Sequence, residues 1–270
     1  MRRRGFLVAA LLGASIGGCH TDTLEIDDRI APVIEGGAVQ RNVNNVLSAV
    51  VTARIHGADS VVVRFHLVDD DAAYGVTPAV GVTDDVAIVP VLGLLPARHY
   101  VLRIVARARR DTTVSEPLLF DTDSLPPDLP QYVASGSSPT PGYVVFAAGA
   151  YGVVIDNGGR VVWYKRFRNG PGLTFTVQPT GRYYARPAGT SPSDPTPWVE
   201  MDALGNVTRT VGCAHALTPR FHDLIATGDD TYWLLCDETR TMDLTGVGGV
   251  ASARVTATDV QRVSSDGKLL

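Results

Sequence analysis

Residues 220–238 read Arg-Phe-His-Asp-Leu-Ile-Ala-Thr-Gly-Asp-Asp-Thr-Tyr-Trp-Leu-Leu-Cys-Asp-Glu. The turn residues at 228–230 separate two apolar runs, and the second run covers residues 232–236. Apolar runs bounded by turn residues are typical of a β-hairpin. We therefore predict a strand, a tight turn and a second strand, with His222 and Asp223 at the head of the first strand.

The hairpin pattern recurs along the second half of the chain. One kind of turn ends on Gly159, Gly205 and Gly267, in the related stretches Ile-Asp-Asn-Gly-Gly-Arg-Val, Met-Asp-Ala-Leu-Gly-Asn-Val and Val-Ser-Ser-Asp-Gly-Lys-Leu. A second kind ends on Gly181 and Gly228. The spacing is 46 residues from Gly159 to Gly205 and 47 residues from Gly181 to Gly228. Two hairpins in each period correspond to four strands, which is the repeat of a β-propeller blade.

The third repeat comes late, because Gly205 and Gly267 are 62 residues apart. The excess lies in the Gly-rich residues 239–256, which we interpret as a long loop at one mouth of the propeller. Residues 142–270 supply about 2.5 blades of this length, whereas a propeller closes with about four or more. The chain also stops at residues 268–270, the first residues of a strand. We interpret the sequence as the N-terminal fragment of a longer protein; a partner that completes the propeller is the alternative.

Bulk composition agrees with an all-β protein. The chain has 270 residues, 45% of them hydrophobic and 19% charged, which is typical of a globular protein. No long stretch has a sustained apolar period of a helix. The formal net charge of −4 gives no basic face for nucleic acid. Three cysteines are too few for a disulfide scaffold.

The part of the chain before residue 123 has the pattern of a β-sandwich. Short β-type runs at residues 48–55, 60–68, 86–91, 100–109 and 118–122 are separated by turn residues at the spacing of a sandwich. Residues 95–106, Leu-Pro-Ala-Arg-His-Tyr-Val-Leu-Arg-Ile-Val-Ala, resemble the fibronectin type III pattern, which implies a fibronectin III or Ig-like sandwich over residues 31–122. Residues 123–141 are rich in Pro and Ser and are predicted to be the linker to the propeller.

The N-terminus resembles an export signal. Residues 1–4 are basic, and the apolar run at 6–16 is too short to span a bilayer, so we interpret residues 1–19 as a signal peptide. Residues 16–19, Ile-Gly-Gly-Cys, resemble a bacterial lipobox. This implies that Cys19 is lipidated, that residues 20–30 are a tether, and that the protein is anchored to a membrane in the periplasm or on the cell surface. An ordinary signal peptide with a chance cysteine is the alternative, and both Sec and twin-arginine export stay open.

Three stretches together resemble the bacterial arylsulfotransferase family. They are residues 142–146 (Gly-Tyr-Val-Val-Phe), 155–164 (Ile-Asp-Asn-Gly-Gly-Arg-Val-Val-Trp-Tyr) and 221–224 (Phe-His-Asp-Leu). The family turn after His-Asp is similar to Pro-Asn-Gly, whereas this chain has Thr-Gly-Asp at 227–229. The resemblance implies an exported protein with a small β-domain before a six-bladed propeller. It also implies transfer of sulfate from a phenolic sulfate donor to a phenol acceptor through a sulfated histidine, without a cofactor.

The same resemblance assigns candidate site residues. His222 would bind the sulfuryl group or assist in acid–base chemistry, and Asp223 would orient a neighbouring group. Tyr151 and Arg186 are weaker candidates for substrate binding at the same mouth. The nucleophilic histidine of the family would lie in a later blade, beyond residue 270. A purely structural histidine is the alternative for His222.

Two other functions stay open at this point. The first is a non-catalytic surface lipoprotein whose propeller binds a protein or a glycan. The second is a quinoprotein dehydrogenase, which would need tryptophan-docking repeats in every blade; the three tryptophans of this chain occupy unlike positions.

The cysteines of the second half have two interpretations. Cys213 and Cys236 either pair, which would stabilise the protein by roughly 3 kcal/mol, or remain two buried thiols. No zinc-ligand spacing surrounds them, and no metal site is predicted.

Overall fold

The computed structural model describes residues 31–270, apart from residues 110 and 190–195 and the side chain of residue 73. The predicted signal peptide, the lipidation site Cys19 and the tether lie outside the described residues. Ala31–Leu270 forms one compact unit. This unit is all-β, as the sequence predicts, and its helical residues are two 3-10 turns, Ala214–Ala216 and Thr245–Val247. Within residues 31–109, 111–189 and 196–270, no helix has the length and apolar character needed to cross a membrane.

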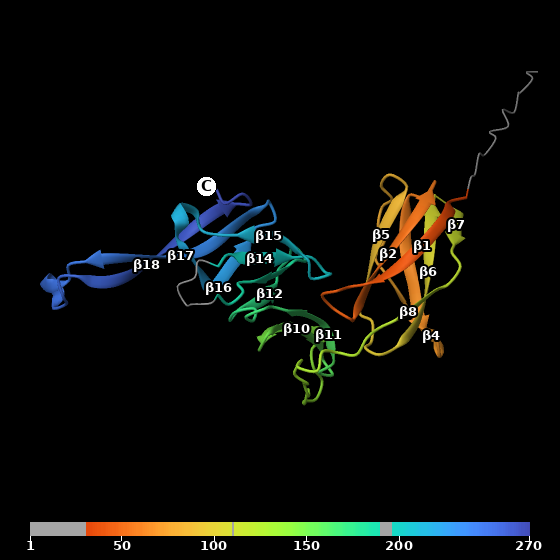
Figure 1. Cartoon of the computed structure of the whole chain (residues 1–270), viewed down its shortest axis with the longest axis horizontal. Helices are drawn as coiled ribbons and strands as arrows, with labels where there is room; N and C mark the ends of the chain where they lie inside the picture. The colour runs from red at the N-terminus through yellow and green to blue at the C-terminus, as the bar shows by residue number, and fades with distance from the viewer. Residues whose placement is uncertain (1–30, 110, 190–195) are drawn as a thin grey trace, which may run out of the picture. The chain divides into compact units, whose positions relative to one another are not determined.

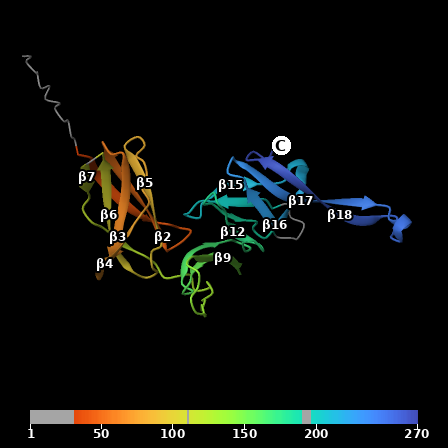
Figure 2. The ribbon, with the colours of Figure 1, turned by 180° about the vertical axis from the view of Figure 1, so that it is seen from behind.

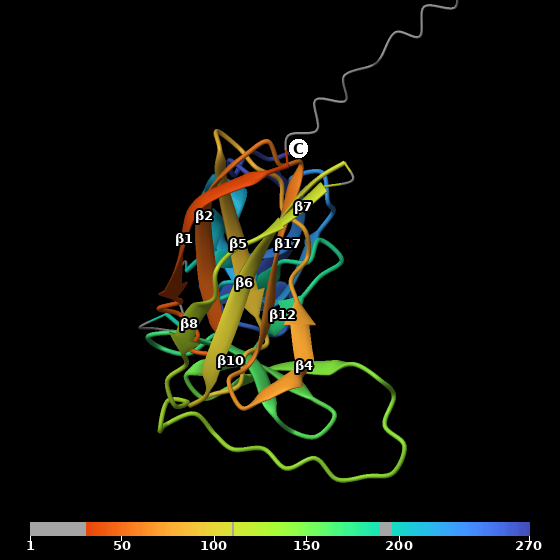
Figure 3. The same ribbon diagram turned by 90° about the vertical axis from the view of Figure 1, so that its right-hand side faces the viewer.

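Two antiparallel sheets form the N-terminal sandwich (Figures 2 and 3). The first sheet has the order β1-β2-β5, with β1 at Val33–Arg41, β2 at Ser48–His56 and β5 at Val86–Leu92. The second has the order β4-β3-β6-β7, with β4 at Asp70–Val76, β3 at Ser60–Leu67, β6 at His99–Ala108 and β7 at Asp111–Val114. Strand β8, Leu118–Asp121, also pairs with β6.

The sandwich core follows from alternating side chains. On β2 the inward residues include Val51 and Ile55, and on β6 they include Leu102 and Ile104; none of these four is exposed to solvent. Side chains two residues apart share one face of a strand, so the inner faces of the two sheets form one apolar cluster. Each fully buried aliphatic side chain of this size contributes about 1.5–3 kcal/mol.

The five strands predicted in the first half are present as β2, β3, β5, β6 and β8. Strands β1, β4 and β7 were not predicted. Their sequences explain why: β1 contains Gly36 and Gly37, β4 begins with two aspartates, and β7 has four residues. Glycine normally weakens a strand. Gly37 lies close to the opposite sheet, because a Cβ atom at this position would meet the terminal methyl group of Ile104, which would have to shift.

Three further antiparallel sheets follow (Figure 1). The first has β9 at Tyr143–Ala148, β10 at Tyr151–Asp156 and β11 at Val161–Arg166. The second has β12 at Phe175–Val177, β13 at Tyr183–Ala185, β14 at Trp198–Met201 and β15 at Val207–Val211. The third has β16 at Thr218–Ala226, β17 at Thr231–Met242 and β18 at Ala253–Ser264. Each sheet is a meander in chain order, and the second has the four strands that the repeat predicts, so the region is an incomplete β-propeller.

The repeated turns have the same hydrogen bonds. Asp156 and Asp202 each pair through their backbone with the residue four positions later, and each carboxylate accepts two backbone N–H groups of its own turn. Ser264 makes the equivalent backbone bonds in the third repeat, and its hydroxyl takes the place of the carboxylate. The following glycine needs a left-handed backbone, with φ of +79° at Gly205. The sequence repeat is therefore a repeat of turn chemistry.

Residues 239–256 are not the long loop predicted from the sequence. Strand β17 continues to Met242 and pairs with β18 from Ala253 onward, so the two strands form an extended hairpin (Figure 1). The pairing of β16 with β17 extends only as far as Thr218, the first residue of β16, which lies opposite Asp237. Beyond Asp237 the hairpin therefore consists of β17 and β18 alone. The physical reason is composition: the arms read Thr-Arg-Thr-Met at residues 239–242 and Ala-Arg-Val-Thr at residues 253–256, and the glycines are confined to the tip.

Aromatic side chains pack between neighbouring sheets. The Trp163 and Tyr183 rings stack with centroids 4.2 Å apart, and Phe175 lies parallel to both. Trp163 Nε1 donates to the Ala203 carbonyl oxygen at 2.8 Å, which links the first sheet to the turn between β14 and β15. Trp198 Nε1 donates to the Arg220 carbonyl oxygen at 3.0 Å, which links the second sheet to the third. Both tryptophans therefore join consecutive sheets.

Candidate functional site

His222 and Asp223 lie inside β16, and the prediction that they head the strand is wrong. The strand begins at Thr218, and its register with β17 is interrupted: Pro219 pairs with Cys236, and Leu224 pairs with Leu234. The four residues 220–223 of β16 therefore lie opposite the single residue 235 of β17. Extra residues on one strand of a pair bend it and change where its side chains point. The Arg-Phe-His-Asp sequence contains no signal of this bulge.

The bulge leaves both candidate side chains exposed. The centroids of the His222 and Phe221 rings are 4.3 Å apart. The His222 backbone carbonyl accepts a hydrogen bond from Thr174 Oγ1 at 3.2 Å. Within the residues that the structure describes, neither the imidazole nor the Asp223 carboxylate has a hydrogen bond or an ion pair. The imidazole is thus open to a ligand, and the orienting role of Asp223 stays a prediction.

Arg220 holds the bulge to the surrounding sheets. Its carbonyl oxygen accepts the Trp198 indole N–H, and its guanidinium donates to Thr258 Oγ1 at 2.9 Å. The same guanidinium lies 3.5 Å from the Asp237 carboxylate. The backbone next to His222 is therefore anchored to β14 and β18, although the imidazole itself is not.

Tyr151 has a partner in the linker. Its side chain is 1% exposed, and its hydroxyl donates to Asp128 Oδ1 at 2.6 Å. The Arg166 guanidinium lies 5.8 Å from the Tyr151 ring centroid and 2.8 Å from the Asp128 carboxylate. Burial and the Asp128 carboxylate raise the pKa of Tyr151 to about 12. These contacts fasten the linker to β10 and β11, and substrate binding by Tyr151 stays a prediction.

Arg186 follows β13 directly and is 8% exposed. Its backbone carbonyl lies against Gly172, whose φ of +84° and lack of a side chain permit the approach. Substrate binding by Arg186 stays a prediction.

Of the predicted site residues, His222 and Asp223 lie next to each other in the bulge, as they do in the sequence. Over the described part of the chain, no hydrogen bond, ion pair or ring contact joins His222 to Tyr151.

Cys213 and Cys236 form a disulfide. Of the two interpretations left open by the sequence, the structure has the paired one, with Cα atoms 5.9 Å apart. Cys236 is completely buried in β17, and Cys213 precedes the 3-10 turn at Ala214–Ala216. The bond fastens the connection between the second and third sheets to the middle strand of the third.

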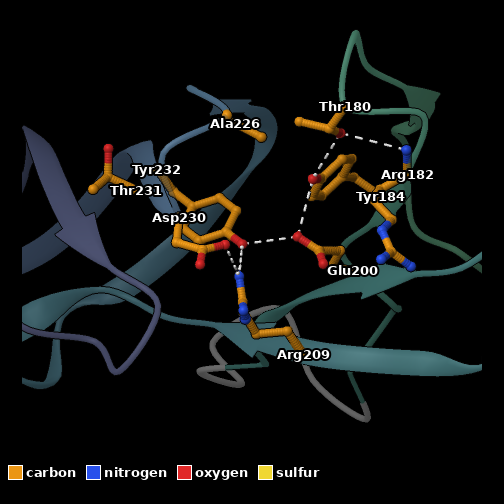
Figure 4. Close-up of a pocket in the computed structure, with 10 residues that line it drawn as sticks. Thr180, Arg182, Tyr184, Glu200, Arg209, Ala226, Asp230, Thr231 and Tyr232 are labelled. Atoms are coloured by element: carbon orange, nitrogen blue, oxygen red, sulfur yellow. Dashed lines mark hydrogen bonds and ion pairs between the residues drawn. The ribbon is translucent and has the colours of Figure 1, made fainter. Parts of the chain in front are cut away.

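A polar cluster that the sequence did not predict lies between the second and third sheets (Figure 4). The Glu200 carboxylate on β14 accepts hydrogen bonds from the hydroxyls of Tyr184, at 3.0 Å, and Tyr232, at 2.8 Å. Thr208 donates to its other oxygen at 3.1 Å. Glu200 is 7% exposed and both tyrosines are 1% exposed. A buried carboxylate is tolerated when several donors satisfy it, and here the donors come from both sheets.

Arg209 on β15 closes the cluster. Its Nη1 atom donates to the Tyr232 hydroxyl at 2.7 Å and to Asp230 Oδ1 at 2.8 Å. The hydrogen bonds that Arg209 donates to Asp230 and Tyr232 raise the pKa of Arg209, so this guanidinium stays charged. Burial and the nearby Glu200 carboxylate raise the pKa of Tyr184 to about 12. Burial also raises the pKa of Tyr232, so at neutral pH both tyrosines are protonated and act as donors to Glu200.

The cluster forms the wall of a pocket of about 200 Å³. The polar residues that line it are Thr180, Arg182, Tyr184, Glu200, Arg209, Asp230, Thr231 and Tyr232. The sequence held one signal of this site: each of the Gly181 and Gly228 turns is followed within four residues by a tyrosine that becomes completely buried. Glu200 and Arg209 lie on other strands, and no short-range pattern connects them to the turns.

Among the described residues, no group of three or more His, Cys, Asp or Glu side chains is placed to hold a metal ion. The site is thus made of an exposed histidine on a bulge and a separate polar pocket between sheets. Comparison of the chain with models of protein families gave no match, and comparison with curated proteins gave none either.

Proposed function

We propose that this chain is part of an exported aryl-sulfate sulfotransferase in which His222 contacts the sulfuryl group. The observation that carries the proposal is the exposed His222 imidazole, which has no polar partner in the described residues although Arg220 and Thr174 hold the backbone around it. The arylsulfotransferase resemblance at residues 142–146, 155–164 and 221–224 supplies the reaction class. The finer fold assignments, a fibronectin III-like sandwich and six blades, belong to the same proposal.

The proposed reaction has two transfers. In the first, the S–O bond of a phenolic sulfate breaks while an S–N bond forms to a nucleophilic histidine in a later blade, and the phenolate leaves with a proton from a general acid. In the second, a general base takes the proton of the acceptor phenol, the S–N bond to the histidine breaks, and an S–O bond forms to the phenol oxygen. His222 would hydrogen-bond the sulfuryl oxygens or carry one of these protons.

The location of the protein is part of the proposal. We propose that Cys19 carries a lipid after removal of residues 1–18, and that the protein is held at a membrane outside the cytoplasm. The support is the lipobox-like sequence Ile-Gly-Gly-Cys after the apolar run at 6–16. The Cys213–Cys236 disulfide agrees with an oxidising compartment.

The test uses the full-length protein with 4-nitrophenyl sulfate as donor and phenol as acceptor. Removal of the imidazole in His222→Ala should lower kcat/KM by about a hundredfold or more. His99→Ala is the matched control, because His99 is an exposed histidine of the sandwich that pairs with Asp121; its kcat/KM should equal that of the wild type. His222→Gln separates the two roles, since a hydrogen-bond donor is kept and a titrating group is lost.

Two results would contradict the proposal. Wild-type kinetics in His222→Ala would remove His222 from the reaction. Absence of sulfate transfer by the wild-type protein, with any of several phenols as acceptor, would favour the non-catalytic binding propeller.

A further inference from the structure

We propose that the pocket between the second and third propeller sheets binds a small hydroxylated carboxylate, of the size of a sugar acid. It is separate from the His222 bulge: its walls include Ala226 at the end of β16 and the turns at Gly228 and Thr180. The proposal does not depend on the sulfotransferase reaction, because it is carried by different residues.

The first step is the supply of hydrogen-bond donors. Arg182 lines the pocket and is partly buried, and among the described residues its guanidinium has no hydrogen bond and no ion pair. Arg209 uses Nη1 for its bonds to Tyr232 and Asp230, which leaves Nε and Nη2 without bonds in the same part of the structure. Figure 4 shows both arginines among the residues that line the pocket. The planar fork of a guanidinium matches a carboxylate with two parallel hydrogen bonds.

The second step is the supply of acceptors. Asp230 Oδ1 accepts from Arg209, and Oδ2 accepts no hydrogen bond within the described residues. Glu200 Oε2 already accepts from two tyrosines, whereas Oε1 accepts a side-chain hydrogen bond from Thr208. A bare inorganic anion offers these oxygens no donor. A ligand that also carries hydroxyl groups would satisfy them, because each hydroxyl both donates and accepts.

Charge and size narrow the ligand further. Asp230 is ion-paired with Arg209, and Glu200 accepts hydrogen bonds from three neutral hydroxyls, so Arg182 is the charged side chain of the pocket that has no hydrogen bond or ion pair in the described residues. This favours a monoanion over a neutral sugar. The volume of about 200 Å³ fits a single six-membered ring and excludes an oligosaccharide from the pocket itself.

The test is calorimetric titration of the full chain with three probes. Glucuronate has a carboxylate and hydroxyls, glucose has hydroxyls alone, and sulfate has charge without hydroxyls. Glucuronate should bind with one site per chain, and glucose and sulfate should each bind at least about tenfold more weakly, the loss expected for one charge-assisted hydrogen bond.

The variant Arg182→Gln should weaken glucuronate binding by about tenfold or more without unfolding the protein, because the Arg182 side chain makes no hydrogen bond in the described structure. Arg168→Gln, at an exposed arginine after β11, is the matched control and should bind as the wild type does. No binding of glucuronate, or equal binding by Arg182→Gln, would overturn the site. Sulfate binding as tightly as glucuronate would overturn the ligand class.

Discussion

The sandwich and the propeller sheets bury different kinds of side chain. The sandwich core is one apolar cluster, and its buried polar residues, Asn45, Ser48, Thr77 and Thr122, are all uncharged. The propeller sheets bury Arg186, Glu200 and Gln261. A buried charge is strongly destabilising unless partners surround it. The propeller buries charged side chains and the sandwich core does not. A functional site is therefore expected in the propeller.

The two regions also differ in how neighbouring sheets are joined. In the sandwich, interdigitating aliphatic side chains join the two sheets. In the propeller, specific bonds cross from sheet to sheet: the indole N–H groups of Trp163 and Trp198, the hydroxyl of Tyr232 on Glu200, and the amide of Gln178 on Leu224 and Ala226. Directional bonds fix the register of two sheets, whereas aliphatic packing tolerates substitution of similar volume.

The largest expected effect tests the covalent bond of the propeller. Replacement of both Cys213 and Cys236 by serine or alanine should lower the free energy of unfolding by about 3 kcal/mol, because the bond closes a loop of 23 residues. Urea denaturation measures the change. Hydrogen exchange of the same variant should rise in β16 and β17 and stay unchanged in β2 and β6. Equal increases of hydrogen exchange in the propeller sheets and in the sandwich would mean that the disulfide stabilises the whole unit. The two regions would then not differ in this respect.

A smaller effect is expected from the buried carboxylate. Glu200→Gln keeps the shape but replaces one acceptor oxygen by a donor that faces the Tyr184 or Tyr232 hydroxyl, and should cost about 1–3 kcal/mol. Glu116→Gln, on the exposed surface of the sandwich, is the matched control and should stay within about 0.5 kcal/mol of the wild type. If the two variants were equally stable, the network would contribute nothing to the joining of the sheets.

The smallest effect is on stability at alkaline pH. The pKa of Tyr184 is raised to about 12 in the folded protein, against an ordinary value near 10. Folding therefore favours the protonated phenol: its contribution is complete below about pH 10 and is lost as the pH rises through 12. Tyr184→Phe should flatten the fall in unfolding free energy over this interval.

Tyr100 of the sandwich sharpens the same test. Burial raises its pKa, but its hydroxyl oxygen accepts a hydrogen bond from the Leu95 N–H, which lowers the pKa and opposes the effect of burial. Tyr100→Phe should therefore flatten the alkaline profile less than Tyr184→Phe does. The reverse order would show that the Glu200 carboxylate has little influence on Tyr184.

The sequence predicted the strands that carry strong local signals. Short β-type runs between turn residues identified β2, β3 and β6. The spacing of Gly159, Gly205 and Gly267 identified the propeller repeat, because a turn that needs a left-handed residue leaves a glycine in the sequence. It missed β1 and β4, where glycines and aspartates hide the strand. It also assigned residues 239–256 to a loop, because glycines at the tip of a hairpin resemble a Gly-rich loop.

The candidate site was predicted less completely than the fold. His222 was selected from the sequence, and its exposure in the structure is compatible with that choice, but the bulge that exposes it was not foreseen. The Glu200 cluster was not foreseen either, because its members come from four strands of two sheets. Contacts between residues 16 to 32 positions apart leave no periodic pattern.

By itself, the sequence determined the all-β class, the two-part organisation of its β-runs and the period of the propeller sheets. These follow from local rules of side-chain alternation and turn chemistry, which act within a few residues. The tertiary structure alone decided that Cys213 pairs with Cys236, that the Arg220–Asp223 segment bulges, and that two repeated tyrosines converge on one carboxylate. Each of these depends on how sheets pack against one another, and packing joins residues that the chain keeps far apart.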